Sequence, residues 1–257
     1  MTPYRLGAAL SAVLGAPVRI RPDLGQAPVR WTTTVLRDHR VRDAGGVDRL
    51  RAMATDLPGV TVDAEDLLTF DVDPAGVEAM LAEPLSDTDV AAAGALARDL
   101  RDPSRPWLLT RDGRRSTYDD LAALVGDAAA RWASARSAGS ARVDVAVDDL
   151  ASATPQNPSF AVLLAHDRLA RGRAPISSGR LVALVGEAPM ALADTVRTGR
   201  TRPWVRHVEA VATEVLSPRP DPPAATVTWT ATRAREAARI VLATGLQTVG
   251  VPAPAQI

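Results

Sequence analysis

This 257-residue chain contains no cysteine, which excludes disulfides, thiolate nucleophiles and cysteine-ligated metal sites. It contains no lysine either, since all 30 basic residues are arginine. A phosphate-loop lysine, a Schiff-base lysine and a lysine nucleophile are therefore excluded. No apolar run approaches the roughly 20 residues that cross a bilayer. The first residues lack the basic and apolar pattern of a secretory signal, so we expect a cytoplasmic protein without a membrane partner.

The overall composition is that of a soluble globular protein, with 46% hydrophobic and 23% charged residues. The net charge of +0 conceals an uneven distribution along the chain. Residues 1–55 carry a net charge of +5, residues 56–103 a net charge of −10, and residues 156–257 a net charge of +5. This asymmetry indicates either separate surfaces with separate tasks or compositional drift of the genome, and composition alone leaves both explanations open.

The first third of the sequence predicts a small α+β domain at 1–82. Residues 5–15 have apolar side chains at helical spacing and end at Gly15, followed by Pro17. Runs rich in β-branched and aromatic residues at 18–20 and 29–35 predict strands. A helix is expected at 47–57, an antiparallel strand pair at 60–62 and 67–72, and a second helix from Pro74 to Leu81.

The rest of the sequence predicts mainly helices. Residues 83–106 resemble a connector that contains a short helix at 89–100. A helical pattern runs from Thr117 to Trp132, and alternating acidic and apolar residues at 143–150 predict an extended segment. Further helices are expected from Pro158 to about residue 171 and at 178–197, 202–216 and 230–249, with a proline-rich loop at 217–225. The expected fold class is mainly α, with a small α+β N-terminal domain.

Two segments near the C-terminus carry a family resemblance. Residues 157–170 read NPSFAVLLAHDRLA, and residues 237–257 read AARIVLATGLQTVGVPAPAQI. Both resemble the arginyl-tRNA synthetase family, whose anticodon-binding domain opens with roughly N-P-x-F-x-V-Q-Y-A-H-A-R. That domain ends with roughly A-x-R-x-V-L-x-N-G-L-x-L-L-G-V-x-A-P-E-R-M. The resemblance implies an all-helical anticodon-binding-like domain at 157–257, with tRNA, and tRNA arginine above all, as the partner.

The resemblance extends upstream, but the residues that correspond to the family's catalytic region differ from its motifs. Residues 107–156 resemble the signature-loop and stem-contact region, and Leu57-Pro58-Gly59-Val60 resembles a turn of the family's N-terminal domain. The position of the signature-loop lysine is occupied by Thr110, and no H-x-G-H pattern surrounds His39, His166 or His207. The connector at 83–106 stands where the nucleotide-binding fold would be and is too short to form it. We therefore expect a non-catalytic relative that needs no cofactor and no metal.

The resemblance also assigns residues to tRNA binding. The family's Q-Y pair becomes Leu163-Leu164, which removes an amide and an aromatic face that could read a base. Phe160 remains aromatic, and arginines of this helix region can contact phosphates without reading base identity. The expected tRNA-binding residues are Phe160, Leu164, Arg168, Arg171, Arg173, Arg239 and Ile257.

Other polar groups have plainer interpretations. His166 is expected to pack or to hydrogen-bond between helices rather than to act in a Ser-His-Asp device. The pairs Asp119-Asp120 and Asp148-Asp149 are interpreted as a helix N-terminal turn and a surface strand end. Arg111–Arg115 are either a tRNA-backbone patch or a solvated loop.

Two functional hypotheses remain at this point. The first is a non-catalytic, arginyl-tRNA synthetase-like protein that binds tRNA. The alternative is a protein-interaction or regulatory module that has lost RNA binding, whose partner is a synthetase or another cytoplasmic enzyme. The zero net charge and the loss of the base-reading pair favour the alternative, whereas the retained motifs favour tRNA.

Overall fold

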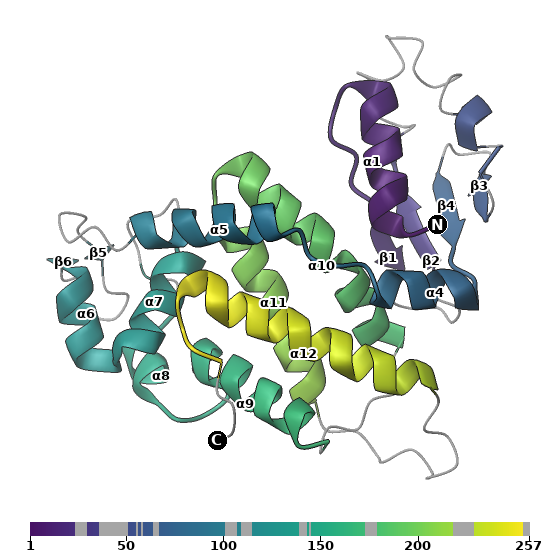
Figure 1. Cartoon of the computed structure of the whole chain (residues 1–257). Helices are drawn as coiled ribbons and strands as arrows, with labels where there is room; N and C mark the ends of the chain where they lie inside the picture. Colours follow the sequence, from purple (N-terminus) through teal and green to yellow (C-terminus); the bar gives the residue numbers. More distant parts are fainter. Residues whose placement is uncertain are drawn as a thin grey trace. The chain divides into compact units, whose positions relative to one another are not determined.

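The structure is a computed structural model that describes residues 1–23, 30–35, 51–54, 56–57, 59–63, 67–100, 107–108, 115–138, 143, 145–172, 179–217 and 229–253. The chain divides into two compact units. Unit 1 comprises Met1–Glu83 and Ser177–Glu187, and unit 2 comprises Pro84–Ile176 and Ala188–Ile257. The expected fold class is confirmed, because most elements are helices and a small antiparallel sheet lies near the N-terminus (Figure 1).

Unit 1 combines helices with a four-stranded antiparallel sheet of order β1-β2-β4-β3. Its elements are α1 (Pro3–Leu14), β1 (Arg21–Asp23), β2 (Arg30–Thr33), β3 (Val60–Val62), β4 (Leu68–Asp71) and α4 (Pro74–Leu81). Figure 1 shows α1 lying along this sheet. The core side chains are fully buried or nearly so: Leu6, Leu10, Ile20, Trp31, Leu68 and Phe70.

Local sequence signals determine the ends of these elements. Thr2 caps the start of α1, and Gly15 ends that helix with a φ of 63°, a left-handed conformation that glycine adopts without strain. Asp73 caps α4 by accepting a hydrogen bond of 2.6 Å from the backbone N–H of Gly76. The predicted pairing of β3 with β4 and the predicted helix α4 are confirmed. The first strand begins at Arg21, directly after the predicted run at 18–20.

Unit 2 is built mainly from helices. Its elements are α5 (Asp87–Asp99), β5 (Trp107–Leu108), β6 (Arg115–Ser116), α6 (Tyr118–Val125), α7 (Asp127–Arg136), α8 (Val147–Ala151), α9 (Pro158–Ala170), α11 (Arg202–Leu216) and α12 (Trp229–Val249). The residues of α10 (Gly179–Thr198) are shared between the two units. The expected late helices are thereby confirmed, each beginning and ending within a few residues of its predicted range.

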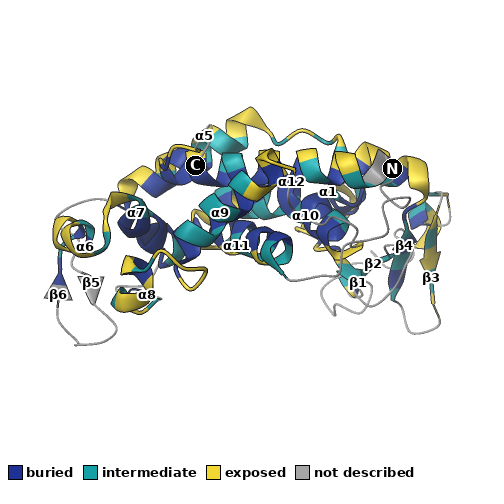
Figure 2. Ribbon diagram, turned by 90° about the horizontal axis from the view of Figure 1, so that it is seen from below, coloured by how far each residue is buried: buried dark blue, intermediate teal, exposed yellow. Residues whose placement is uncertain are grey.

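The packing of unit 2 centres on α9. This helix packs against both α11 and α12, and α5 packs against α12 (Figure 1). The helices turn their buried sides inward and leave exposed stripes on the outside (Figure 2). The indole N–H of Trp204, on α11, donates a hydrogen bond of 3.0 Å to the hydroxyl of Thr248 on α12. The buried face of α11 is therefore tied to the last turn of α12.

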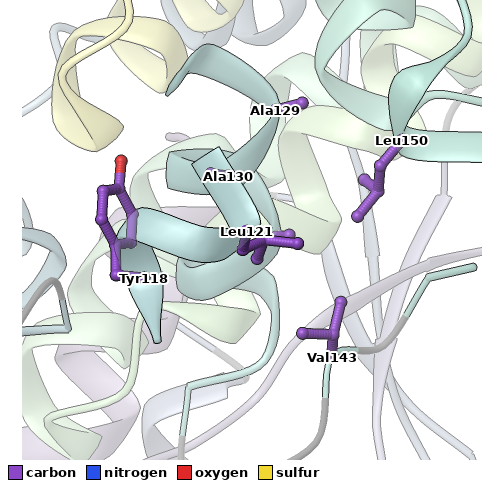
Figure 3. Packing of buried hydrophobic residues seen from close by; sticks show 7 residues of the cluster. Tyr118, Leu121, Ala129, Ala130, Val143 and Leu150 are labelled. Atoms are coloured by element: carbon purple, nitrogen blue, oxygen red, sulfur yellow. The ribbon is translucent and has the colours of Figure 1, made fainter. Parts of the chain in front are cut away.

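In the middle segment one prediction is confirmed and one was wrong. The helical pattern from Thr117 to Trp132 forms two helices, α6 and α7, which are separated by Gly126 with a φ of 84°. The segment predicted to be extended at 143–150 is helical from Val147 onward, as α8. The helical turn carries Leu150 into a buried cluster with Leu121 and Val143 (Figure 3). Burial of Leu150 therefore outweighs the alternating pattern of the preceding valines.

Candidate nucleic-acid interface

The start of α9 is fixed by Asn157. Its carboxamide oxygen accepts hydrogen bonds from the backbone N–H of Ser159 at 3.1 Å and of Phe160 at 3.4 Å. Its amide nitrogen donates to the backbone carbonyls of Leu150 at 2.6 Å and Ser152 at 3.0 Å. Asn157 thus caps α9 and joins it to the end of α8, and Pro158 occupies the first helical turn, where no N–H is needed.

Four of the expected RNA-binding residues share one face of α9. Phe160, Leu164, Arg168 and Arg171 follow one another at intervals of four, four and three residues, so they lie on one side of a helix with 3.6 residues per turn. We call this set the α9 ridge. Phe160 and Leu164 are half-buried, whereas Arg168 and Arg171 are exposed. The opposite face of the helix is buried through Val162, Ala165, His166 and Leu169.

His166 lies on the buried side of α9 and is 5% exposed. Burial lowers its pKa, the positive charge of Arg239 lowers it further, and the charge of Asp167 opposes the shift. Nδ1 of His166 has no hydrogen-bond partner in the described part of the chain. The lowered pKa favours the neutral imidazole, and the Ser159 hydroxyl, two helical turns away on the same helix, donates to Asn157 at 2.8 Å. This geometry supports the packing interpretation and does not form a Ser-His-Asp catalytic triad.

The arginines around α9 differ in how their charges are compensated. Nε of Arg171 lies 2.8 Å from a carboxylate oxygen of Asp167, its neighbour on the same helix. Arg168 on α9 and Arg239 on α12 are both exposed, and neither has an ion-pair or hydrogen-bond partner for its side chain among the described residues. Arg239 belongs to α12, which packs against α9, and its positive charge lowers the pKa of His166. Arg168 follows His166 by two residues and so projects to the other flank.

A further arginine lies at the C-terminal end of α9. A Cβ atom on Gly172 would lie 3.5 Å from Nη1 of Arg235, which belongs to α12. A positive charge at this end stabilises the helix dipole. Arg173 and Ile257, which the sequence also assigned to tRNA binding, lie outside the described residues, as do Arg111–Arg114. Of Arg115 only the backbone is described, in β6.

The adjacent acidic pairs occupy helix starts rather than a catalytic site. Asp120 completes a capping box with Thr117, and its pKa is lowered first by the Thr117 backbone N–H and then by the Thr117 hydroxyl. This confirms the interpretation of Asp119-Asp120 as a helix N-terminal turn. The interpretation of Asp148-Asp149 as a strand end was wrong, because both lie in the first turn of α8. Within the described ranges, no three His, Asp or Glu residues are grouped to hold a metal ion.

No sequence pattern indicated a depression in unit 2, which opens between α7, α8, α9 and α11. It has a volume of about 460 Å³, and its lining includes Arg136, Asp149, Gln156 and Glu209. These residues come from distant parts of the sequence, so no local motif indicated that they meet.

Among the helices that the structure describes, none has the length and apolar content to span a membrane.

Comparisons with known proteins give a distant and partial likeness. No family model matches the chain. One similar solved structure is assigned as an arginyl-tRNA synthetase from Campylobacter jejuni, with a TM-score of 0.45 and 13% identity; the match covers 57% of this chain and 38% of that one. Another is the Thermus thermophilus arginyl-tRNA synthetase, with a TM-score of 0.42 and 16% identity, covering 66% of this chain and 32% of that one. The chain thus spans well under half the length of either protein.

Proposed function

We propose that this chain is a non-catalytic protein that binds tRNA across α9, with the arginines of α9 and α12 contacting the phosphate backbone. The observation that carries the proposal is that Arg168 on α9 and Arg239 on the neighbouring α12 are both exposed and have no acidic partner among the described residues. An arginine without an acidic partner is available to a phosphate, and such contacts position an RNA strand without reading its sequence.

The α9 ridge supports RNA as the partner. Its N-terminal half presents the half-buried side chains of Phe160 and Leu164, and its C-terminal half presents Arg168 and Arg171. Apolar or aromatic groups beside cations suit a single-stranded RNA segment, because bases stack on the former and phosphates pair with the latter. The motif that starts at Asn157-Pro158 resembles the anticodon-binding helix of arginyl-tRNA synthetases, which favours tRNA over other RNAs.

The proposed lack of catalysis rests on the sequence. Activation of an amino acid by a class I synthetase requires positive charge against the phosphates of ATP. This chain has no lysine, has Thr110 at the position of the signature-loop lysine, and has no H-x-G-H pattern. We expect no amino-acid-dependent exchange of pyrophosphate into ATP, with arginine or with any other amino acid. Exchange above the background of a protein-free reaction would refute this part of the proposal.

Filter binding of total cytoplasmic tRNA, repeated over a range of salt concentrations, tests RNA binding directly. We expect dissociation constants in the micromolar range or below at low salt, with affinity that falls steeply as salt rises. A chain that retains no tRNA even at low salt would contradict the proposal and favour the protein-interaction alternative. Competition with an unstructured polynucleotide of matched length then separates tRNA preference from general attraction to phosphate.

A further inference from the structure

The depression between α7, α8, α9 and α11 has an electrically balanced floor. One carboxylate oxygen of Glu209 accepts a hydrogen bond of 2.9 Å from the indole N–H of Trp132, and the other pairs with the guanidinium of Arg136. Both side chains of this ion pair are largely buried, with 14% of Arg136 and 13% of Glu209 exposed. The floor is therefore rigid and neutral overall, and it attracts neither a free anion nor a free cation strongly.

Two hydrogen-bonding side chains that line the depression have no partner in the part of the chain that the structure describes. Asp149 and Gln156 both line it, both are exposed, and neither side chain has a partner among the described residues. Pro155, Pro158 and Ala161 also line the depression, although most of its lining surface is polar. A small ligand suits this lining if it donates hydrogen bonds to a carboxylate and accepts one from an amide.

We propose that this depression binds a single unpaired guanine base. The adjacent N1–H and N2–H donors of guanine match the two oxygens of the Asp149 carboxylate, and its O6 can accept from the Gln156 amide. A free phosphate would be repelled by the exposed carboxylate of Asp149. The volume of about 460 Å³ lies within the range of small-ligand sites.

The position of the depression relative to the α9 ridge favours an RNA base over a basic side chain of a protein partner. Ala161, on its wall, and Arg168 are separated by seven residues, so they lie two turns apart on one side of α9. That separation is about 10.5 Å along the helix axis, a distance that a short stretch of extended nucleotides spans. An RNA strand held by Arg168 can therefore place a base in the depression. The inference rests on the proposed function and adds a base-specific contact to it.

The indole N–H of Trp132 provides a local reporter, since it is hydrogen-bonded to the floor. The experiment titrates the full chain with guanosine, which has no phosphate, and follows the assigned indole resonances of Trp132 and Trp204. We expect a saturable shift at Trp132 and no shift at Trp204, whose indole is bonded to Thr248 elsewhere in the unit. Inosine, which lacks the N2 amine, and adenosine are expected to bind more weakly.

Asp149→Asn is expected to weaken guanosine binding about tenfold, because the asparagine carboxamide has one acceptor oxygen in place of the two that match the N1–H and N2–H donors of guanine. Asp119→Asn is the matched control, since it removes one exposed carboxylate from the first turn of another short helix. The proposal is overturned if guanosine does not shift the indole resonance of Trp132, or if adenosine binds equally well. It is also overturned if arginine amide, which mimics a basic side chain of a protein partner, is the only one of these compounds that gives a saturable shift. Guanosine carries no phosphate, so its binding is measured independently of the proposed phosphate contacts. If the chain binds guanosine but not tRNA, only the proposed function is rejected. If it binds tRNA but not guanosine, only the base site is rejected.

Discussion

Asn157 has a structural role that is separate from RNA binding. Its side chain makes five hydrogen bonds, to the first turn of α9 and to the end of α8. All of its donor and acceptor groups are engaged inside the protein, and the residue is 6% exposed. The Asn-Pro start of the motif is therefore explained by the folding of unit 2.

Asn157→Asp separates the two functions of this side chain. The carboxylate retains the capping acceptor but cannot donate to the carbonyls of Leu150 and Ser152, so we expect a loss of about 1–3 kcal/mol in the free energy of unfolding. Asn157→Ala also loses the cap and is expected to cost about 1 kcal/mol more. Urea denaturation measures both. Ser86→Ala removes the exposed cap of α5 and serves as a milder reference; equal effects at the two sites would contradict the account.

Glu187, in the part of α10 that belongs to unit 1, gives the fold a pH dependence. Burial raises its pKa to about 7, and the charge of Arg21 opposes the rise. Between the ordinary value of 4.5 and about 7, the folded chain holds a proton that the unfolded chain has released. The contribution of Glu187 to stability is therefore most favourable below this window and is lost as the pH rises through it.

Glu187→Gln is expected to remove this dependence. At pH 8 the variant should be more stable than the parent chain, by at most about 3.5 kcal/mol at about 1.4 kcal/mol per pKa unit. At pH 4.5 the two should be nearly equal. Thermal or urea unfolding across this pH range measures the difference, with Glu236→Gln on the exposed side of α12 as control. A stability difference that does not change with pH would show that the carboxyl group of Glu187 is ordinary.

At the scale of helices, Gly245 determines how closely α12 approaches α11. A Cβ atom at this position would lie 2.6 and 2.7 Å from the two methyl groups of Val208, which is fully buried. A valine side chain has one main rotamer in a helix and cannot move aside. Gly94 on α5 is a useful contrast, because a Cβ there would lie 3.7 Å from the carbonyl of Thr248, an ordinary contact.

Gly245→Ala is expected to lower the free energy of unfolding by about 1–2 kcal/mol, since the cost of overpacking exceeds the gain in helix propensity. Gly94→Ala should be neutral or slightly stabilising for the same propensity reason. When Gly245→Ala is added to Val208→Ala, the double variant should recover part of the free energy of unfolding that Val208→Ala alone loses. If Gly245→Ala is as stable as the parent chain, the close approach of the two helices is not as we describe it.

The elements that sequence patterns predicted well are those with local start signals. Thr117 with Asp120, Asp73 with Pro74, and Asn157 with Pro158 each form their caps within a few residues, so the sequence alone indicates where α6, α4 and α9 begin. The start of α8 has no such signal, because Ala146 precedes it without a side-chain cap. It forms because Leu150 packs against Leu121 and Val143, a tertiary contact that no local window contains.

At the scale of the whole molecule, the candidate site was predictable only in part. The helical period places Phe160, Leu164, Arg168 and Arg171 on one face, so this grouping follows from the sequence. The compensation of Arg171 by Asp167 is also local. The approach of Arg239 to His166, and the meeting of Arg136, Asp149 and Glu209 around one depression, depend on how α7, α8, α9, α11 and α12 pack. Long-range contacts of this kind leave no pattern in a single sequence.

Charge variants around α9 test the central claim most directly, by the affinity for tRNA at one low salt concentration and by its salt dependence. Arg168→Ala with Arg239→Ala should weaken binding and reduce the slope of log affinity against log salt by about one for each arginine. Asp167→Asn should tighten binding, because it releases Arg171 from its ion pair. Arg197→Ala with Arg233→Ala removes the same charge from ion-paired positions and should change little. Equal affinities and equal slopes for all three variants would contradict the account.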